Sequence, residues 1–546
     1  MPMINTTTLW FIVFIWLCSI ATLPAQDFVE TAKLSPTVRH DQQKFGGTVA
    51  ISGNYAIVGA RNEEYDANEE NPMQQAGAAY IFEKENDVWV FKQKLVQEHR
   101  WFNDEFGVFV SIEGEYAVIG IRGEDLDDPN DPDSNRSTQV GAAMVYKRDT
   151  DGIWKEYQLL SAGDEPGRGG QTGEKFGFPV KIKEGIIIAG ALRTSKWVNG
   201  EYLARIGSVY VFEKDETTGL WVKQKQLMAS DPVGQDQFGK MFDINDGTII
   251  IGAALHEPGG IGTWVGAAYV FTKDETGEWV ERQKLEASNP ASYAQFGESV
   301  AITGDYIFCG AQGLQTQYEF GNDSAYGAVY VFKKNTEGLW EEVQYMVLDD
   351  IGSFDEKFGQ SISAYGDKVL ISANEKYIDN RTGNGQGKCY LYELNPNSGT
   401  WDLIQTIVPE NHYRPKEFGL HIIMNEDRII VADENDDGSD QNVNYNFSGA
   451  AHIFEINESL SIPDRIQNSN DIQVFPNPVG NYFFIKSEHS LSSSTITITD
   501  MLGRTVYADF GISIDRNAKI PADFSKGTYV LQVISNGQTY ITKFTK

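Results

Sequence analysis

The chain has 546 residues, of which 77 are acidic and 45 are basic, so its formal net charge is −32. A surface of that sign repels nucleic acid and anionic membranes, and neither is expected as a partner. A hydrophobic share of 41% together with 53 glycines is typical of a sheet-rich globular protein and not of a disordered one. We interpret the acidity as a solvated coat that keeps an extracellular protein soluble; attraction of cations or basic partners is the alternative.

Residues 1–25 have the features of a secretory signal peptide. An apolar run from Leu9 to Ile20 precedes a short segment that ends at Ala25, after which we expect cleavage. The run is too short to span a bilayer comfortably, so no transmembrane span is expected after the signal is removed. The signal predicts export.

One pattern occurs seven times along the chain, at a period of roughly 60 residues, and such self-similarity predicts a repeat fold. Each copy begins with a Phe-Gly pair, at Phe45, Phe106, Phe176, Phe238, Phe296, Phe358 and Phe418. A second Gly element follows in step, at Gly77, Gly141, Gly207, Gly266, Gly327, Gly387 and Gly449.

Short apolar runs bounded by turns predict four strands in each copy. In the fifth copy these strands are expected at residues 299–303, 306–311, 328–333 and 340–346, with a tight turn at Gly304-Asp305 between the first two. Four antiparallel strands per unit are typical of a propeller blade. After removal of residues 1–25 the chain keeps two cysteines, Cys309 and Cys389. They fall in different copies and are expected to be buried free thiols.

The outer strand shows how the repeat closes. A Trp begins the fourth strand of six copies, but the last copy ends at residue 456 without one. Residues 28–34, with Phe28 and Leu34 six positions apart, match the missing strand. The sequence therefore predicts an all-β, seven-bladed β-propeller over residues 26–457, whose N-terminal strand closes the last blade and leaves no repeat-sized edge exposed.

The long connections, from the second to the third strand and from the fourth strand to the next copy, fall on one face of such a fold. Loops gathered on one rim of a rigid scaffold are the usual place for binding. Aromatic side chains in these loops either stack on sugar rings and anchor a protein partner, or are buried beneath neighbouring loops. The candidate binding residues are Trp101, Phe102, Trp197, Trp264 and Tyr326.

Two of these loops, at residues 124–135 and 433–440, are unusually acidic. Carboxylates at alternating spacing suit a hard cation such as Ca²⁺, although neither loop has EF-hand spacing. A solvated acidic loop is the alternative for both. The candidate Ca²⁺ ligands in the first loop are Asp125, Asp127, Asp131 and Asp133.

The seven copies resemble FG-GAP repeats, the blades of integrin-α-type β-propellers, over residues 28–457. Calcium-binding members of that family carry an Asp-rich loop between the first two strands, whereas this chain has only short turns such as Gly304-Asp305 there. The resemblance therefore implies the fold but not the calcium sites of the family, and no cofactor is implied.

After a polar linker at residues 458–471, residues 472–546 form a different unit with alternating strands, which predicts a small β-sandwich. This unit resembles the type A C-terminal sorting domain of the Bacteroidetes type IX secretion system. The resemblance implies export through the periplasm and the outer membrane, with that machinery as partner, to the outer cell surface or the medium. The motif residues are Pro476, Asn477, Pro478, Asp500, Gly503, Arg504, Gly527, Tyr529 and Lys543.

No strong catalytic motif occurs, such as His-Glu-x-x-His or Gly-x-Ser-x-Gly, and His421 and His452 are expected to be core or rim residues. We therefore expect a secreted or cell-surface binding or adhesion protein that uses the long-loop face to bind an extracellular protein or glycan. The alternatives are a carbohydrate-active enzyme, such as a polysaccharide lyase or glycosidase, and a structural component of a surface complex, because propeller sites leave no local motif.

Overall fold

The structure is a computed structural model that describes residues 28–124, 140–163, 174–257, 263–314, 326–348, 356–375, 387–409, 417–436, 447–456, 472–475, 479–480, 482–487, 491–500, 505–514, 517–522, 524–535 and 538–546. The chain divides into two compact units, one of Asp27–Ile456 and one that contains Asn457–Lys546. All regular elements in the described residues are β-strands, which confirms the all-β prediction. None of these residues forms a helix that could cross a membrane.

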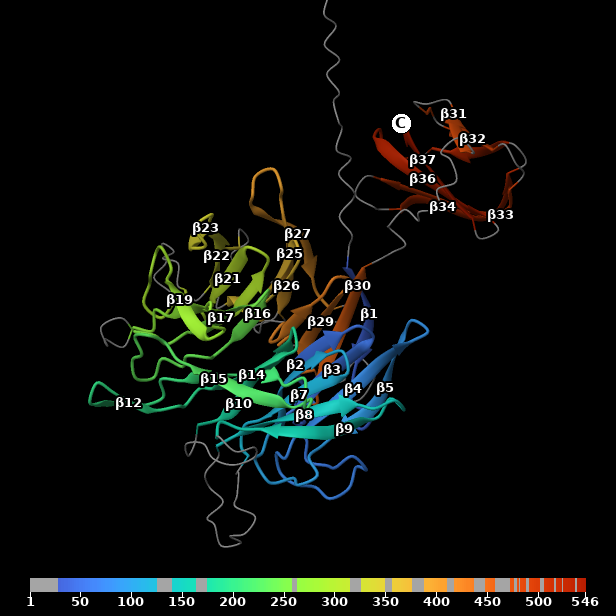
Figure 1. Cartoon of the computed structure of the whole chain (residues 1–546). Coiled ribbons are helices and arrows are strands. Elements are labelled where there is room, and N and C mark those ends of the chain that lie inside the picture. Colours follow the sequence, from blue (N-terminus) through green and yellow to red (C-terminus); the bar gives the residue numbers. More distant parts are fainter. Residues whose placement is uncertain are drawn as a thin grey trace, which may run out of the picture. The chain divides into compact units, whose positions relative to one another are not determined.

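The first unit contains, within the described residues, seven antiparallel sheets of four strands, and they follow one another in chain order (Figure 1). The first three sheets are β2 (Phe45–Ser52), β3 (Tyr55–Ala60), β4 (Ala78–Glu85) and β5 (Val88–Leu95); β6 (Phe106–Glu113), β7 (Tyr116–Ile121), β8 (Ala142–Arg148) and β9 (Trp154–Leu160); and β10 (Phe176–Lys183), β11 (Ile186–Ala191), β14 (Ser208–Lys214) and β15 (Trp221–Leu227).

The next three sheets are β16 (Phe242–Asn245), β17 (Thr248–Ala253), β18 (Ala267–Lys273) and β19 (Trp279–Leu285); β20 (Val300–Thr303), β21 (Tyr306–Ala311), β22 (Ala328–Lys334) and β23 (Trp340–Met346); and β24 (Phe358–Tyr365), β25 (Lys368–Ala373), β26 (Lys388–Leu394) and β27 (Trp401–Ile407). The strands of the fifth copy thus lie within one residue of the predicted ranges.

The last sheet joins the two ends of the unit. It contains β28 (Ile422–Met424), β29 (Arg428–Asp433), β30 (Ala450–Ile456) and, at its edge, the N-terminal strand β1 (Phe28–Leu34). In β1, Phe28 pairs with Ile456 and Leu34 pairs with Ala451, and Figure 1 shows β1 in blue beside β30 in orange.

Neighbouring sheets touch at the two glycine motifs of the repeat. The glycine before the third strand of one sheet forms a parallel bridge with the phenylalanine of the next Phe-Gly pair, as between Gly77 and Phe106. The same bridge joins Gly449 of the last sheet to Phe45 of the first. The phenylalanines are fully buried and pack edge-on against an aromatic ring of the third strand, as Phe296 does against Tyr330.

One loop departs from the expected irregular connection. Residues 193–206 contain a small hairpin of β12 (Lys196–Val198) and β13 (Glu201–Leu203), which turns at Asn199-Gly200. Both turn residues have positive φ, 51° and 88°, as a two-residue hairpin turn requires. The Asn-Gly pair is a strong local hairpin signal, so this element was open to prediction from the sequence.

The second unit consists of two antiparallel sheets whose buried faces share one hydrophobic cluster, which includes Ile485, Ile498 and Val533. Its strands are β31 (Ile472–Phe475), β32 (Tyr482–Ser487) and β35 (Asn517–Pro521) in one sheet, and β33 (Leu491–Asp500), β34 (Thr505–Ile514), β36 (Thr528–Ser535) and β37 (Gln538–Thr545) in the other. In the first unit, Cys309 and Cys389 are free and fully buried, as expected.

Candidate functional site

Most of the loop aromatics are exposed and paired with a second ring. Trp197 on β12 is 69% exposed, and its ring lies 5.5 Å from that of Tyr202 on β13. Trp264 lies in the loop before β18, and its ring is 5.6 Å from that of Tyr293, which precedes the next sheet. Because strands alternate in direction, both pairs lie at the same end of the sheets, which we call the loop end.

The remaining aromatic candidates differ in exposure. Trp101 and Phe102, between the first two sheets, are both exposed at the loop end, with their ring centroids 5.8 Å apart. Tyr326 is half-buried, and its backbone carbonyl accepts a hydrogen bond from Phe358. The candidates therefore form separate two-ring surfaces on different sheets instead of one cluster. Tyr202 and Tyr293 are the partners that the sequence analysis missed.

The pair of Trp264 and Tyr293 is held in place by its backbone. The amide of Tyr293 donates to the carbonyl of Thr263 at 2.5 Å, and the amide of Gln295 donates to the carbonyl of Trp264 at 3.1 Å. Trp264 and Tyr293 both have positive φ, 38° and 64°, an unusual backbone for bulky residues. These bonds hold together the backbones of the two loops that carry the rings.

Of the two acidic loops, the first lies outside the description. Asp125, Asp127, Asp131 and Asp133 fall within residues 125–139, which are not among the described residues. Whether they hold Ca²⁺ stays a prediction.

The described part of the second acidic loop is buried, so the alternative of a solvated loop is wrong for these residues. Asp433, Glu434 and Asp436 are each less than 5% exposed. Arg61 lies 2.5 Å from Glu434, and Lys33 lies 2.9 Å from Asp436. The basic partners come from the N-terminal strand and the first sheet, which the chain brings beside its last sheet.

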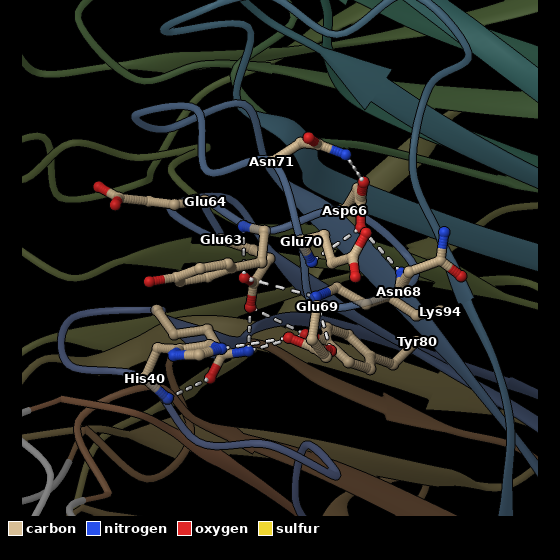
Figure 2. Close-up of polar contacts among 12 residues, drawn as sticks. His40, Glu63, Glu64, Asp66, Asn68, Glu69, Glu70, Asn71, Tyr80 and Lys94 are labelled. Carbon is tan, nitrogen blue, oxygen red and sulfur yellow. Dashed lines mark hydrogen bonds and ion pairs between the residues drawn. The ribbon is translucent and has the colours of Figure 1, made fainter.

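A third group of carboxylates, around Glu63, surrounds a buried lysine (Figure 2). Ligand atoms of His40, Glu63 and Glu69 lie within 4.8 Å of one another, close enough to share a metal ion. Lys94 nevertheless already lies there, with its Nζ 2.9 Å from Glu69 and 3.4 Å from Glu63. A metal ion would share both carboxylates with a buried ammonium group, and the charge repulsion opposes this.

Glu63 is fully buried and its carboxylate oxygens have several donors. The hydroxyl of Tyr80 donates to it at 2.9 Å (Figure 2). The amide of Tyr65 donates at 2.8 Å, and the side chain of Gln43 also donates. Burial raises the pKa of Tyr80 and the neighbouring charge of Glu63 raises it further. This group therefore acts as a satisfied polar network under the loop end.

A cavity of about 320 Å³ lies where the first strands of the seven sheets meet. Its lining includes Lys181 and Lys183 of β10, Asp243 of β16 and His421, which directly precedes β28. Lys181 lies 2.5 Å and Lys183 4.0 Å from the same oxygen of Asp243. Burial alone would raise the pKa of Asp243, but the two ammonium charges hold it below its ordinary value.

His421 occupies the cavity wall as a neutral imidazole. Its Nδ1 accepts a hydrogen bond from the amide of Val49 in the first sheet, at 3.3 Å. Burial and the nearby charge of Lys181 lower its pKa to about 4. The proton of the neutral ring therefore lies on Nε2, for which the described residues offer no hydrogen-bond acceptor.

In the second unit, the described motif residues have structural roles. Tyr529 is buried, and its hydroxyl donates to the carbonyl of Ser525 at 2.6 Å. Gly527 exchanges two backbone hydrogen bonds with Lys546, while Lys543 on β37 is exposed. Asp500 ends β33, where its backbone pairs with Tyr529. The other motif residues, Pro476, Asn477, Pro478, Gly503 and Arg504, lie outside the described residues.

Solved structures with a similar chain course share little sequence with this protein. Sqt1 of Saccharomyces cerevisiae is 10% identical, with a TM-score of 0.40, over 94% of this chain and 100% of its own. A putative 6-phosphogluconolactonase of Bacteroides fragilis is 12% identical, with a TM-score of 0.37, over 66% of this chain and 84% of its own. The periplasmic gluconolactonase PpgL of Pseudomonas aeruginosa is 11% identical, with a TM-score of 0.38, over 66% and 85%. No curated protein matches the chain.

Family models match both units. The FG-GAP repeat model matches residues 28–82, 89–146, 221–271 and 279–332. The model of the secretion system C-terminal sorting domain matches residues 473–546. Both matches confirm the resemblances seen in the sequence, and the second indicates export with either release or attachment to the outer cell surface. The chain therefore contains FG-GAP repeats and a C-terminal sorting domain of the type IX secretion system.

Proposed function

We propose that this protein is an extracellular binding protein whose loop end recognises a glycan. The observation that carries the proposal is the set of exposed aromatic pairs, above all Trp197 with Tyr202 and Trp264 with Tyr293. Exposed aromatic rings offer an apolar face for sugar rings, and their few rotatable bonds limit the entropy lost on binding. Export by the sorting domain brings the loop end into contact with extracellular polysaccharide.

We also propose a closed propeller as the architecture that presents these rings. The seven sheets are the blades of a closed propeller formed by residues 26–457, with β1 as the outer strand of the last blade. Pairing of β1 with β30 and the bridge from Phe45 to Gly449 support this closure. Residues 1–25 are a signal peptide, 458–471 a linker and 472–546 the sorting domain. A closed ring is a rigid scaffold, so loops at its end keep fixed relative positions.

The first test is a glycan array with the mature chain from residue 26, followed by calorimetry on any glycan that binds. We expect the double variant Trp197→Ala with Tyr202→Ala to weaken binding at least about tenfold, which corresponds to about 1.4 kcal/mol. The matched control is Leu220→Ala, because Leu220 is an exposed apolar residue at the opposite end of the same sheet.

The same glycans are then assayed for new reducing ends and unsaturated products. Binding without product, lost in the aromatic variant and kept in the control, supports the proposal. An array without any bound glycan, or depolymerisation of the bound polysaccharide, contradicts it; the first outcome favours a protein ligand and the second an enzyme.

A further inference from the structure

The central cavity extends toward the end of the sheets that is opposite to the aromatic loops. Its inner wall includes Phe109, Met241 and His421, and its lining continues along the first strands to Gly53 and Asn425, beside the short turns. The first strands of neighbouring sheets lie in contact around the cavity, including β28 with β2. The cavity is thus separate from the aromatic pairs at the loop end.

The carboxylates of the cavity already have their donors. One oxygen of Asp243 accepts from Lys181 and from its neighbouring amide at Ile244, and the other accepts from the amide of Ile302 at 3.0 Å. Glu113, at the turn end of the lining, accepts from the amides of residues 184 and 185 at 2.7 and 3.0 Å. Neither carboxylate needs a further cation or donor.

The cavity therefore has donors left over. Lys181 and Lys183 share the single carboxylate of Asp243, and among the described residues Lys183 otherwise has only the side-chain oxygen of Asn245, at 3.4 Å. Each ammonium group has three protons to donate, and His421 adds the proton on Nε2. All these groups are partly buried. Solvent therefore screens their attraction for an anion between them less than it would at the open surface.

The geometry points to a binding site for a small oxyanion in this cavity, held by Lys181, Lys183 and the Nε2 proton of His421. A carboxylate, sulfate or phosphate group offers the acceptors that these donors lack. The volume of about 320 Å³ is at the lower end of the range for small-molecule sites, which fits a ligand no larger than a monosaccharide acid. A chain of net charge −32 would thus hold an anion where Lys181 and Lys183 converge on the carboxylate of Asp243.

The test measures binding to the mature full chain at neutral pH and constant ionic strength. The probes are inorganic phosphate, sulfate and glucuronate, with glucose as the neutral match of glucuronate. We expect saturable heat of binding for at least one oxyanion and none for glucose. Binding of phosphate or sulfate alone identifies a free inorganic ion as the ligand, whereas binding of glucuronate as well identifies the carboxylate of an acidic sugar.

Substitutions of the lysines test which residues bind the oxyanion. We expect Lys183→Met to weaken oxyanion binding at least about tenfold and Lys183→Arg to keep most of it, because arginine preserves the charge. Lys183 is chosen because Lys181→Met removes the close partner of buried Asp243 and risks unfolding. Lys225→Met is the matched control, since Lys225 also pairs with a carboxylate, at 2.9 Å from Glu278, but lies outside the cavity lining.

Thermal stabilisation alone is not the readout, because sulfate and phosphate stabilise many proteins by exclusion from their surface. Saturable binding that Lys183→Met abolishes supports the proposal. Binding that is equal in the parent and in Lys183→Met, or no saturable binding of any oxyanion at millimolar concentration, overturns it. The aromatic double variant is expected to bind the oxyanion like the parent, so failure of the glycan proposal and failure of this one are distinguishable.

Discussion

At the scale of single residues, the glycine that precedes the third strand of each sheet has a position that no other residue fits. Gly77 has a φ of 85°, and a Cβ built there would lie 2.1 Å from the carbonyl oxygen of Phe106 in the next sheet. The same carbonyl-to-Cβ conflict recurs at Gly141, Gly207, Gly266, Gly327, Gly387 and Gly449. The repeated glycine therefore allows two backbones from adjacent sheets to approach closely.

Substitution of Gly77 and of a second glycine distinguishes the close approach of the two backbones from the strain that a positive φ causes in any other residue. Gly152, in the turn between β8 and β9, has a φ of 83° but nothing within 4 Å of a built Cβ. We expect Gly152→Ala to lower the free energy of unfolding by about 1–2 kcal/mol and Gly77→Ala by about 1–3 kcal/mol more. Chemical denaturation of both variants measures the difference. Equal losses would mean that the sheets separate at no cost and that the contact between them is unimportant.

At the scale of elements, the single strand β1 joins the N-terminal end of the first unit to its last sheet. Phe28 and Leu34 at its two ends are each 2% exposed, whereas the residues between them are partly or fully exposed. Phe28 packs into the cluster that contains Leu391, Ile407 and Phe454. Two buried apolar side chains, a ladder of backbone hydrogen bonds, and the polar contacts of Glu30 with His452 and of Lys33 with Asp436 therefore attach β1 to the last sheet.

Truncation of Phe28 tests the contribution of β1. We expect Phe28→Ala to lower the free energy of unfolding by about 3–5 kcal/mol, because a fully buried ring is removed from a packed cluster. Val29 follows it in the same strand and is 37% exposed, so Val29→Ala should change stability by less than about 0.5 kcal/mol. If both variants unfold like the parent, β1 is not part of the stable fold and the proposal of a closed ring is wrong.

The hairpin of β12 and β13 shows how an element can create a site. The turn at Asn199-Gly200 pairs Trp197 directly with Tyr202, so the two rings lie side by side on one face of the hairpin. Without the turn, the same two residues would be five positions apart in an irregular loop. Local turn chemistry thus produces the most exposed aromatic surface of the described residues.

At the scale of the whole molecule, polar side chains of the first strands tie each sheet to the next. Ser111 bonds Ile182 of the next sheet, Asp243 accepts from Ile302, and Ser363 accepts from Met424 at 3.0 Å. His421 continues this series across the junction of the last and first sheets by accepting from Val49. Protonation of His421 would replace that acceptor by a donor and place a charge beside Lys181.

The pH dependence of stability follows from this histidine. Its pKa is about 4 in the folded chain against 6.5 for an ordinary histidine, so the unfolded chain binds more protons between these values. Stability is therefore fully present above pH 6.5 and falls as the pH drops toward 4, by about 3 kcal/mol in total. His421→Gln, which keeps an acceptor for Val49 but does not titrate, should flatten this part of the profile.

The measurement is the free energy of unfolding at several pH values between 4 and 8 for the parent and for His421→Gln. His452 provides an internal contrast, because burial lowers its pKa but the neighbouring carboxylates of Asp433 and Glu30, at 3.5 and 2.6 Å, outweigh this and raise it. Its contribution is present at low pH and is lost as the pH rises through its raised pKa, in both proteins. Parallel profiles for the two proteins would show that His421 is not held neutral in the folded chain.

Periodicity alone determined much of this protein. The repeat period and the short apolar runs between turns predicted the all-β fold and the strands of the fifth copy to within one residue, because each strand depends on local alternation and turn residues. The two family resemblances rested on separate local motifs, one on the repeat and one on the motif residues of 472–546, and both were confirmed. The sequence left open whether Trp197 is exposed or buried beneath neighbouring loops, and the structure shows it to be exposed.

Only the tertiary structure decided which distant residues meet. The carboxylates of the second acidic loop are buried because Lys33 and Arg61, hundreds of positions earlier in the chain, lie beside them. Lys181 and Asp243 occupy the same position of the repeat in neighbouring copies, but their 2.5 Å contact depends on how adjacent sheets pack. Sequence patterns specify which face of a strand is buried, whereas charge pairing and cavities arise from the spatial order of the sheets, which brings separate parts of the chain into contact.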